Sequence, residues 1–195
     1  MAAFATELNR DFAAFNAQGR FATALLVTYF APQDHLLICN AGHPRPLWYR
    51  ARTKQWRLLE PQMTETVERI QGAQNLPLGV IEDTEYAQFA VKLEPGDFVV
   101  LYTDCLIESQ SPQGHELGER GLLELISQLP VKSTKELSQA LTRALEQHRG
   151  SKPACDDQTV MILHHNAGEP PPMMRVWGGI TELALHLGLI DYSSR

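Results

Sequence analysis

Long hydrophobic runs are missing from this sequence of 195 residues. A membrane-spanning helix needs about 20 consecutive apolar residues, and no run in the chain reaches that length. The first residues also lack the basic stretch and apolar core of a secretory signal. We therefore expect a cytoplasmic protein without membrane partners.

Positive charge and paired cysteines are scarce as well. The formal net charge is −6, so we expect no surface for nucleic acid. The three cysteines, Cys39, Cys105 and Cys155, have no CxxC spacing, which argues against a disulfide framework and against a structural zinc site. Hydrophobic residues make up 44% and charged residues 21%, the balance of a globular domain.

The pattern of apolar residues predicts an α+β fold with antiparallel sheets. Helical spacing predicts helices over residues 2–16, 116–129 and 133–149, the first with Phe4, Leu8, Phe12 and Phe15 on its apolar face. β-prone runs predict strands over residues 20–30, 34–41, 47–51, 55–60, 85–93, 98–103 and 158–165. Residues 61–79 have weak periodicity, which predicts a surface loop. Strands come first and helices later, so alternating βαβ units are not expected.

Composition divides the chain near residue 165. We expect a domain over residues 1–165 and a proline-rich linker with a C-terminal tail over residues 166–195. Within the tail, residues 180–192 could form a short amphipathic helix. Its glycines favour a frayed or self-docked segment over a helix that binds a partner.

Carboxylates stand at the ends of two buried strands. Asp104 directly follows "FVVLYT", and Asp156 and Asp157 directly precede "QTVMIL". Aspartate is common in turns, and turn chemistry alone explains most such positions. Neighbouring strand ends can also bring carboxylates together, and Mg²⁺ or Mn²⁺ prefers oxygen ligands. Spacing alone does not decide between a turn and a metal site.

Several motifs occur in an order that resembles one known family. They are "FATALLVTYF", "LLICNAGHPRPLWYR", "LPLGV", "LEPGDFVVLYTDCLIESQSPQGHELGERGLLELI" and "DDQTVMIL". Together they resemble the SpoIIE-like branch of the metal-dependent (PPM, protein phosphatase 2C-type) serine/threonine phosphatases, over about residues 1–164. The resemblance implies a β-sandwich flanked by helices and a site with two Mn²⁺ or Mg²⁺ ions. The catalytic group it implies is the metal-bound water.

The resemblance also implies roles for individual residues. Asp104 matches the aspartate of the family's "TDG", and Asp156 matches the first aspartate of "DDxT", so both would be metal ligands. Asp157 would orient the loop or a group beside the metal. Gly42 and His43 would belong to a structural turn.

The chain departs from the family pattern in two ways. Cys105 occupies a position where the family usually has glycine, so it is either a tolerated small residue or a thiol beside the metals. The family's "GD" strand and "DxxGHG"-type turn, which supply the remaining metal ligands, are absent. We therefore expect a fold that is incomplete at its N-terminus, with open sheet edges and half of a dinuclear site.

Three explanations of this half site stay open: a truncated phosphatase, a degenerate homologue, or a site completed by another chain. The resemblance implies hydrolysis of phosphoserine or phosphothreonine on a regulatory protein of an anti-sigma-factor-type circuit in bacteria. The alternative is a non-catalytic pseudophosphatase that binds proteins. A phosphoprotein partner and a possible homo-oligomer are expected. Arg20, Arg45 and Arg50 are expected to be solvated surface residues.

Overall fold

The computed structural model describes residues 1–15, 19–73, 75–153 and 157–168. The described residues contain three α-helices: α1 (Ala2–Phe15), α2 (Gly118–Ser127) and α3 (Thr134–Arg149). Two 3-10 turns are present in the same part of the chain: η1 (Ala31–Gln33) and η2 (Asp104–Leu106). The strands are β1 (Ala24–Phe30), β2 (His35–Ala41), β3 (Leu47–Arg50), β4 (Gln55–Leu58), β5 (Thr66–Ile70), β6 (Gln88–Lys92), β7 (Phe98–Tyr102) and β8 (Val160–His164).

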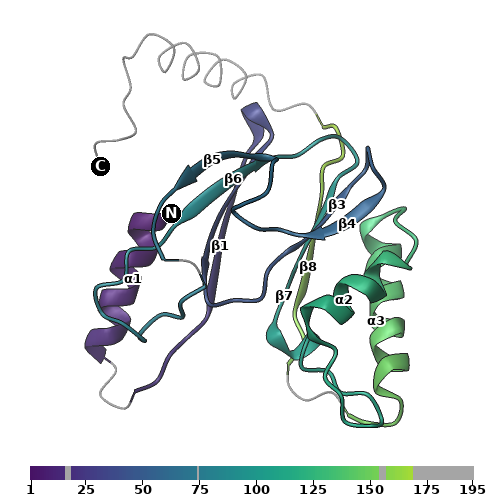
Figure 1. Cartoon of the computed structure of the whole chain (residues 1–195). Coiled ribbons are helices and arrows are strands. Elements are labelled where there is room, and N and C mark those ends of the chain that lie inside the picture. Colours follow the sequence, from purple (N-terminus) through teal and green to yellow (C-terminus); the bar gives the residue numbers. More distant parts are fainter. Residues whose placement is uncertain (16–18, 74, 154–156, 169–195) are drawn as a thin grey trace.

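The strands form two antiparallel sheets that face each other. One sheet has the order β1-β2-β6-β5, and the other has the order β4-β3-β7-β8. Helix α1 lies beside the first sheet, and α2 and α3 lie beside the second (Figure 1). The structure thus confirms the expected α+β fold, an antiparallel sandwich flanked by helices.

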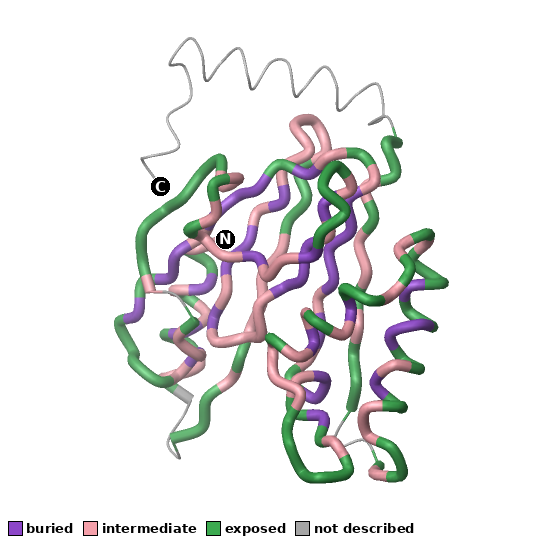
Figure 2. The backbone as a smooth tube through the Cα atoms, turned by 45° about the vertical axis from the view of Figure 1, so that its right-hand side comes forward, coloured by how far each residue is buried: buried purple, intermediate pink, exposed green. Residues whose placement is uncertain are grey.

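Three apolar clusters hold these layers together, and the buried backbone in Figure 2 is concentrated in the central strands. Inner-face residues of both sheets form one cluster, including Trp48, Val91 and Val99, all 0% exposed. A second joins β7 to α2 and α3, and a third joins β2 to α1. Alternation of inward and outward side chains along each strand lets a strand contribute to two clusters.

The strands predicted over residues 20–30 and 34–41, and over residues 47–51 and 55–60, are confirmed and form two hairpins. In the β1–β2 pair, Phe30 pairs with His35 across η1, and in the β3–β4 pair, Arg50 pairs with Gln55. The predicted loop over residues 61–79 is wrong at β5, which pairs with β6. Strand β5 contains charged residues and lies at the edge of its sheet, so its sequence lacks the alternation of apolar residues that would predict a strand. The expectations for residues 166–195 fall largely on positions 169–195, outside the described residues.

Helix α1 forms where its periodicity predicts it, and Leu8 and Phe12 of the predicted apolar face pack against the third cluster, but Phe4 does not. Phe4 is 59% exposed, whereas Ala5 and Asn9 are 1% and 0% exposed. The Asn9 amide donates to the carbonyls of Ile81 and Glu82 at 2.8 and 2.7 Å. The most buried positions of α1 are therefore a small residue and a polar side chain whose hydrogen bonds are satisfied.

Arg50 is not the solvated surface residue that the sequence suggests. It is 6% exposed, its guanidinium donates to Glu65 at 2.5 Å, and its Cζ lies 5.0 Å from the Trp48 ring centroid. A guanidinium can be buried in this way because the carboxylate and the ring face together replace its hydration. Over the described residues, the structure has no helix long and apolar enough to cross a membrane.

Candidate metal site at the end of strand β7

The end of β7 brings Asp104 to the surface. Thr103 is extended, with φ −76° and ψ 159°, and Asp104 opens the turn η2. The Asp104 Oδ1 accepts a hydrogen bond from the Cys105 N–H at 3.0 Å, and its carbonyl accepts from the N–H groups of Ile107 and Glu108 at 2.8 and 3.0 Å. The side chain is exposed. Asp104 therefore shapes the turn and also presents its carboxylate to solvent.

The segment before β8 lies beside this strand end. The Thr103 N–H donates to the Thr159 carbonyl at 3.1 Å, and the Thr159 N–H donates back to Thr103 Oγ1 at 3.1 Å. The Thr103 hydroxyl also donates to the Asp157 carbonyl at 3.4 Å. Asp157 is exposed, and Asp156 lies outside the described residues. The antiparallel pairing of β7 and β8 thus brings Asp157 close in space to the residue before Asp104.

Cys105 is a buried thiol, 1% exposed. It is not among the described non-glycine residues with positive φ. The backbone conformation at position 105 therefore does not require glycine. The side chain packs inward from η2 while Asp104 points outward.

A tight turn after β2 faces the same strand end. Gly42 has φ +74°, and a Cβ at this position would lie 2.5 Å from Pro77 Cγ. The Asn40 side chain closes the turn, because its Oδ1 accepts from the His43 N–H at 2.8 Å and its Nδ2 donates to the His43 carbonyl at 2.9 Å. Sequence reasoning missed Asn40. Its place in "NAGHP", three residues before the histidine, is the signal that could have found it.

The His43 ring contacts both the start of β1 and the end of β7. Its Nδ1 lies 3.3 Å from Thr23 Oγ1. Burial lowers the pKa of His43 below 6.5, although a hydrogen bond to the Tyr102 backbone and the Asp104 carboxylate act in the opposite direction. A neutral imidazole at neutral pH fits the structural role assigned to this turn.

Arg45 joins the same turn to helix α2. Its backbone N–H donates to Glu119 Oε1 at 2.8 Å, and its Nε and Nη2 donate to Glu119 Oε2 at 2.9 and 2.6 Å. Its Nη1 pairs with Glu60. Two carboxylates therefore neutralise Arg45, which is a structural connector and not the solvated arginine that the sequence suggests.

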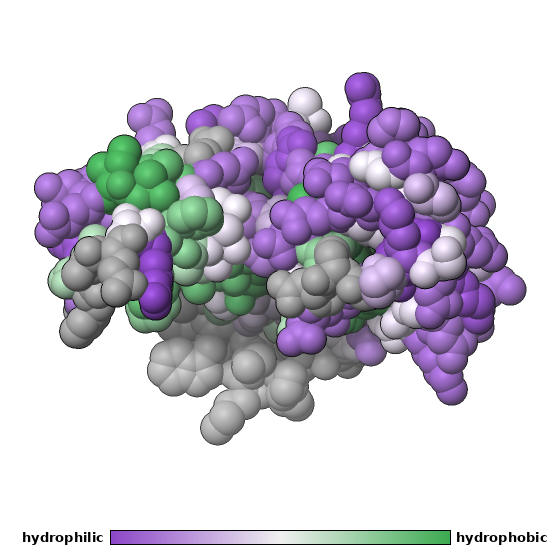
Figure 3. All heavy atoms as spheres, turned by 90° about the horizontal axis from the view of Figure 1, so that it is seen from below, coloured by the Kyte–Doolittle hydropathy of each residue, from purple (hydrophilic) through white to green (hydrophobic). Residues whose placement is uncertain are grey.

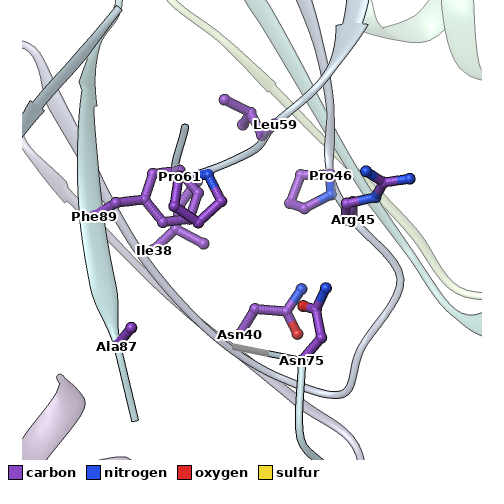
Figure 4. A pocket seen from close by; sticks show the side chains of 9 residues that line it. All are labelled: Ile38, Asn40, Arg45, Pro46, Leu59, Pro61, Asn75, Ala87 and Phe89. Carbon is purple, nitrogen blue, oxygen red and sulfur yellow. The ribbon is translucent and has the colours of Figure 1, made fainter. Parts of the chain in front are cut away.

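These elements surround an open depression of about 450 Å³. Its lining residues are Thr23, Gly42, His43, Pro44, Arg45, Asn75, Asp104, Ile107, Glu108 and Glu119. A second cavity, of about 30 Å³, lies between the two sheets behind Arg45 and is lined mainly by apolar groups (Figure 4). That volume holds only one or two waters. The depression is the candidate substrate site because Asp104 lines it.

The surface around the depression differs between its two sides. Seen from below, hydrophilic side chains dominate on the side of α2 and α3, and hydrophobic side chains gather on the side of α1 (Figure 3). Apolar residues exposed in α1 and the neighbouring loops include Phe4, Phe21, Val80 and Ile81. The depression therefore lies between an apolar and a polar surface.

The described residues supply part of a metal site. Among them, no group of three or more His, Cys, Asp or Glu side chains is placed to hold an ion. Asp104 and Glu108 nevertheless both line the depression with carboxylate oxygens, the donors that Mg²⁺ and Mn²⁺ prefer. The donor chemistry fits these metals, and the donor number is incomplete within the described part of the chain.

Comparisons with known proteins agree on one family. The family model for stage II sporulation protein E (SpoIIE) matches residues 1–166. Phosphoserine phosphatase RsbU of Bacillus subtilis (strain 168) is 26% identical over 143 residues, which cover 73% of this chain and 38% of RsbU. This chain therefore spans well under half of the length of that relative.

Solved structures give the same fold. The SiaA-PP2C domain of Pseudomonas aeruginosa superposes with a TM-score of 0.66 at 18% identity, covering 84% of this chain and 60% of that one. The Mn-presoaked phosphatase domain of SpoIIE from Bacillus subtilis gives a TM-score of 0.55 at 15% identity, covering 76% and 59%. At these identities the match establishes the fold alone.

Proposed function

This chain belongs to the SpoIIE family of PP2C-type phosphatases, and we propose that it forms part of a metal-dependent protein serine/threonine phosphatase that acts on a phosphorylated regulatory protein. One observation carries the proposal: the exposed Asp104 lines a 450 Å³ depression where β7 ends beside the segment before β8. The relative RsbU is named a phosphoserine phosphatase, which supports phosphoserine as the substrate residue. A cytoplasmic anti-sigma-factor-type circuit is the setting that we propose.

We propose Asp104 and Asp156 as metal ligands, with Mn²⁺ or Mg²⁺ as the ion. When bound, such an ion lowers the pKa of its water and stabilises charge that develops on phosphoryl oxygens. Thr103 fixes the segment before β8 through its hydroxyl, and Asp157 is proposed to orient that segment. Cys105 anchors η2 from the buried side, and Gly42 and His43 form the opposite wall.

If the protein is active, the ligands that the described residues lack would come from Asp156 together with residues of a longer phosphatase that contains this segment or of a second chain that completes it. A non-catalytic binding module is the second candidate function. It is favoured by the absence, among the described residues, of any cluster of three metal-ligating side chains.

The test is Mn²⁺-dependent phosphate release from a phosphoserine protein, with Mn²⁺ binding measured alongside. Removing a ligand should cost at least about 100-fold in activity, so Asp104→Ala should lose release and weaken Mn²⁺ binding. Asp83→Ala, which removes an exposed carboxylate that does not line the depression, is the matched control. A folded protein that binds no Mn²⁺ and releases no phosphate would favour the binding module instead.

A further inference from the structure

A pocket lies where the end of α3 meets the loop between η2 and α2. In that loop Gln110 and Glu116 form an antiparallel bridge, which makes residues 110–116 a small hairpin. The hairpin packs against the helix end: a Cβ on Gly150, the C-cap of α3, would lie 3.1 Å from Pro112 Cγ. Figure 1 shows this loop beside the C-terminal turn of α3. The contact holds the last residues of α3 against a loop that starts beside the depression.

This pocket has a volume of about 340 Å³, and we call it the α3 pocket. One water needs only about 10–15 Å³ of such space, so the α3 pocket has room for a side chain. The residues that line it include Glu108, Ser109, Gln110, Glu116, Arg149 and Lys152. Glu108 lines the depression that contains Asp104 as well, so the two hollows are neighbours on the surface.

Ser109 contributes a hydroxyl to the wall of the α3 pocket. The residue is 1% exposed, and its Oγ has no hydrogen-bond partner among the described residues. Its carbonyl, in contrast, accepts from the Leu117 N–H at 3.0 Å and from His148 Nε2 at 3.2 Å, and both bonds fix the backbone of Ser109. Buried polar groups in folded proteins nearly always have a partner, so a hydroxyl held in this way is available to a ligand.

Arg149 brings positive charge to the same wall. Its Nε and Nη1 are buried without a partner, and neither Arg149 nor Lys152 forms an ion pair with another described residue. A guanidinium with buried donors normally faces an oxyanion, because its planar fork of N–H groups matches two oxygens. Arg149 therefore lacks the carboxylate that Arg45 has in Glu119 and that Arg50 has in Glu65.

The carboxylates of the α3 pocket belong to exposed residues, Glu108 and Glu116. Their negative charge repels a small ion with more than one negative charge, such as free phosphate at neutral pH. The same carboxylates can accept hydrogen bonds from main-chain N–H groups. A single carboxylate on a polypeptide suits both parts of the pocket, because its acidic group can reach Arg149 and Ser109 while its main chain lies along the two glutamates.

We propose that the α3 pocket is a subsite for an acidic side chain of the phosphorylated protein. Arg149 and Ser109 hold the carboxylate, and Lys152 adds positive charge. This assignment rests on the proposed function, because it takes the bound chain to run from the depression across Glu108 into the α3 pocket. The subsite gives the protein a preference for substrates that have aspartate or glutamate near the phosphoserine.

Calorimetric titration of the full chain with two phosphoserine peptides, in the presence of Mn²⁺, tests the proposal. One peptide carries glutamates on both sides of the phosphoserine, and the other has glutamine in place of each glutamate. We expect the glutamate peptide to bind at least about tenfold more tightly, as a charge-assisted hydrogen bond predicts. Arg149→Gln should remove this preference. Ser109→Ala should weaken binding of the glutamate peptide about threefold, because it removes a neutral donor.

Arg143→Gln is the matched control, because Arg143 is an exposed arginine of α3 that does not line the α3 pocket. It removes the same charge from the same helix and should leave the preference unchanged within about twofold. Ser109→Ala keeps the test valid should Arg149→Gln fail to fold, because it removes only a hydroxyl that has no partner. Inorganic phosphate alone, titrated into the unsubstituted chain and into Arg149→Gln, tests for a free anion.

Several results would overturn the proposal. They are equal affinity for the two peptides, a preference that persists in Arg149→Gln, and a preference that Arg143→Gln removes as well. Binding of inorganic phosphate that Arg149→Gln abolishes, without a peptide preference, would assign the α3 pocket to a free anion instead. Phosphate release from both peptides is measured separately. A glutamate preference without Mn²⁺-dependent release would contradict the proposed function and leave the subsite intact, whereas release without a preference would do the reverse.

Discussion

The Asn40 side chain should be the main support of the turn that carries His43, and Asn40→Ala tests this. The substitution removes two hydrogen bonds, of 2.8 and 2.9 Å, to the His43 backbone. Each hydrogen bond contributes about 0.5–1.5 kcal/mol to the free energy of unfolding, so the loss of both costs at most about 3 kcal/mol. Asn40 and His43 are only half-buried, and water can replace part of what is lost. We therefore expect the free energy of unfolding to fall by about 1–2 kcal/mol.

Chemical denaturation gives the stability change, and hydrogen exchange gives its location. In Asn40→Ala the His43 amide loses its acceptor and should exchange faster than in the unsubstituted chain. Thr142→Ala, which removes a hydroxyl bonded at 3.0 Å to a carbonyl on an exposed helix surface, is the control and should change stability by less than about 0.5 kcal/mol. Unchanged stability together with an unchanged rate for the His43 amide would refute the reasoning.

Three further substitutions follow from the structure. Gly42→Ala should lower the free energy of unfolding by about 2–4 kcal/mol in chemical denaturation, because φ is +74° and the added Cβ would overlap Pro77. A loss below about 1 kcal/mol would contradict this. Burial alone would raise the pKa of Asp34, but the hydrogen bond from His165 helps to lower it below 3.8. The free energy of unfolding that the Asp34–His165 pair contributes should therefore be fully present above about pH 3.8 and should be lost as pH falls through the folded-state pKa of Asp34. In acid-unfolding curves, His165→Ala should make this pH-dependent loss of stability smaller. Ser133→Ala should lower the free energy of unfolding by about 1 kcal/mol, because the Ser133 hydroxyl accepts a hydrogen bond from the Glu136 N–H in the first turn of α3 at 3.2 Å. Thermal unfolding measures the change, with Ser138→Ala as the control.

Local periodicity was enough to predict most of the fold. Helix α3 begins one residue after its predicted start, with Ser133 as its N-cap, and β7 ends one residue before its predicted end. Helix α2 starts two residues later than predicted, at Gly118 with φ +66°, and ends two residues earlier, at Ser127. Strand β5 could not be predicted, since an exposed edge strand is held by pairing with β6 and not by an apolar pattern of its own.

The sequence predicts a site only where a motif is present. Asp104 stays a predicted metal ligand, proposed from its position after a buried strand together with the family resemblance; the structure places it in the depression. The Arg45–Glu119 pair joins residues 74 positions apart, and no local pattern signals such a contact. The sequence also gives no sign that Asp97 is buried (1% exposed), because "EPGD" is the pattern of an ordinary surface turn. Its carboxylate in fact accepts from the indole of Trp48 at 3.1 Å.

The Arg45–Glu119 pair also constrains how the sequence can change over evolution. Replacing either partner alone leaves a half-buried charge without its counter-ion, with side chains 32% and 24% exposed, and frees α2 from the wall of the depression. A replacement of both partners avoids this penalty. Among sequences of this family, positions 45 and 119 should therefore covary, and neighbouring exposed positions on α2 should drift independently of position 45.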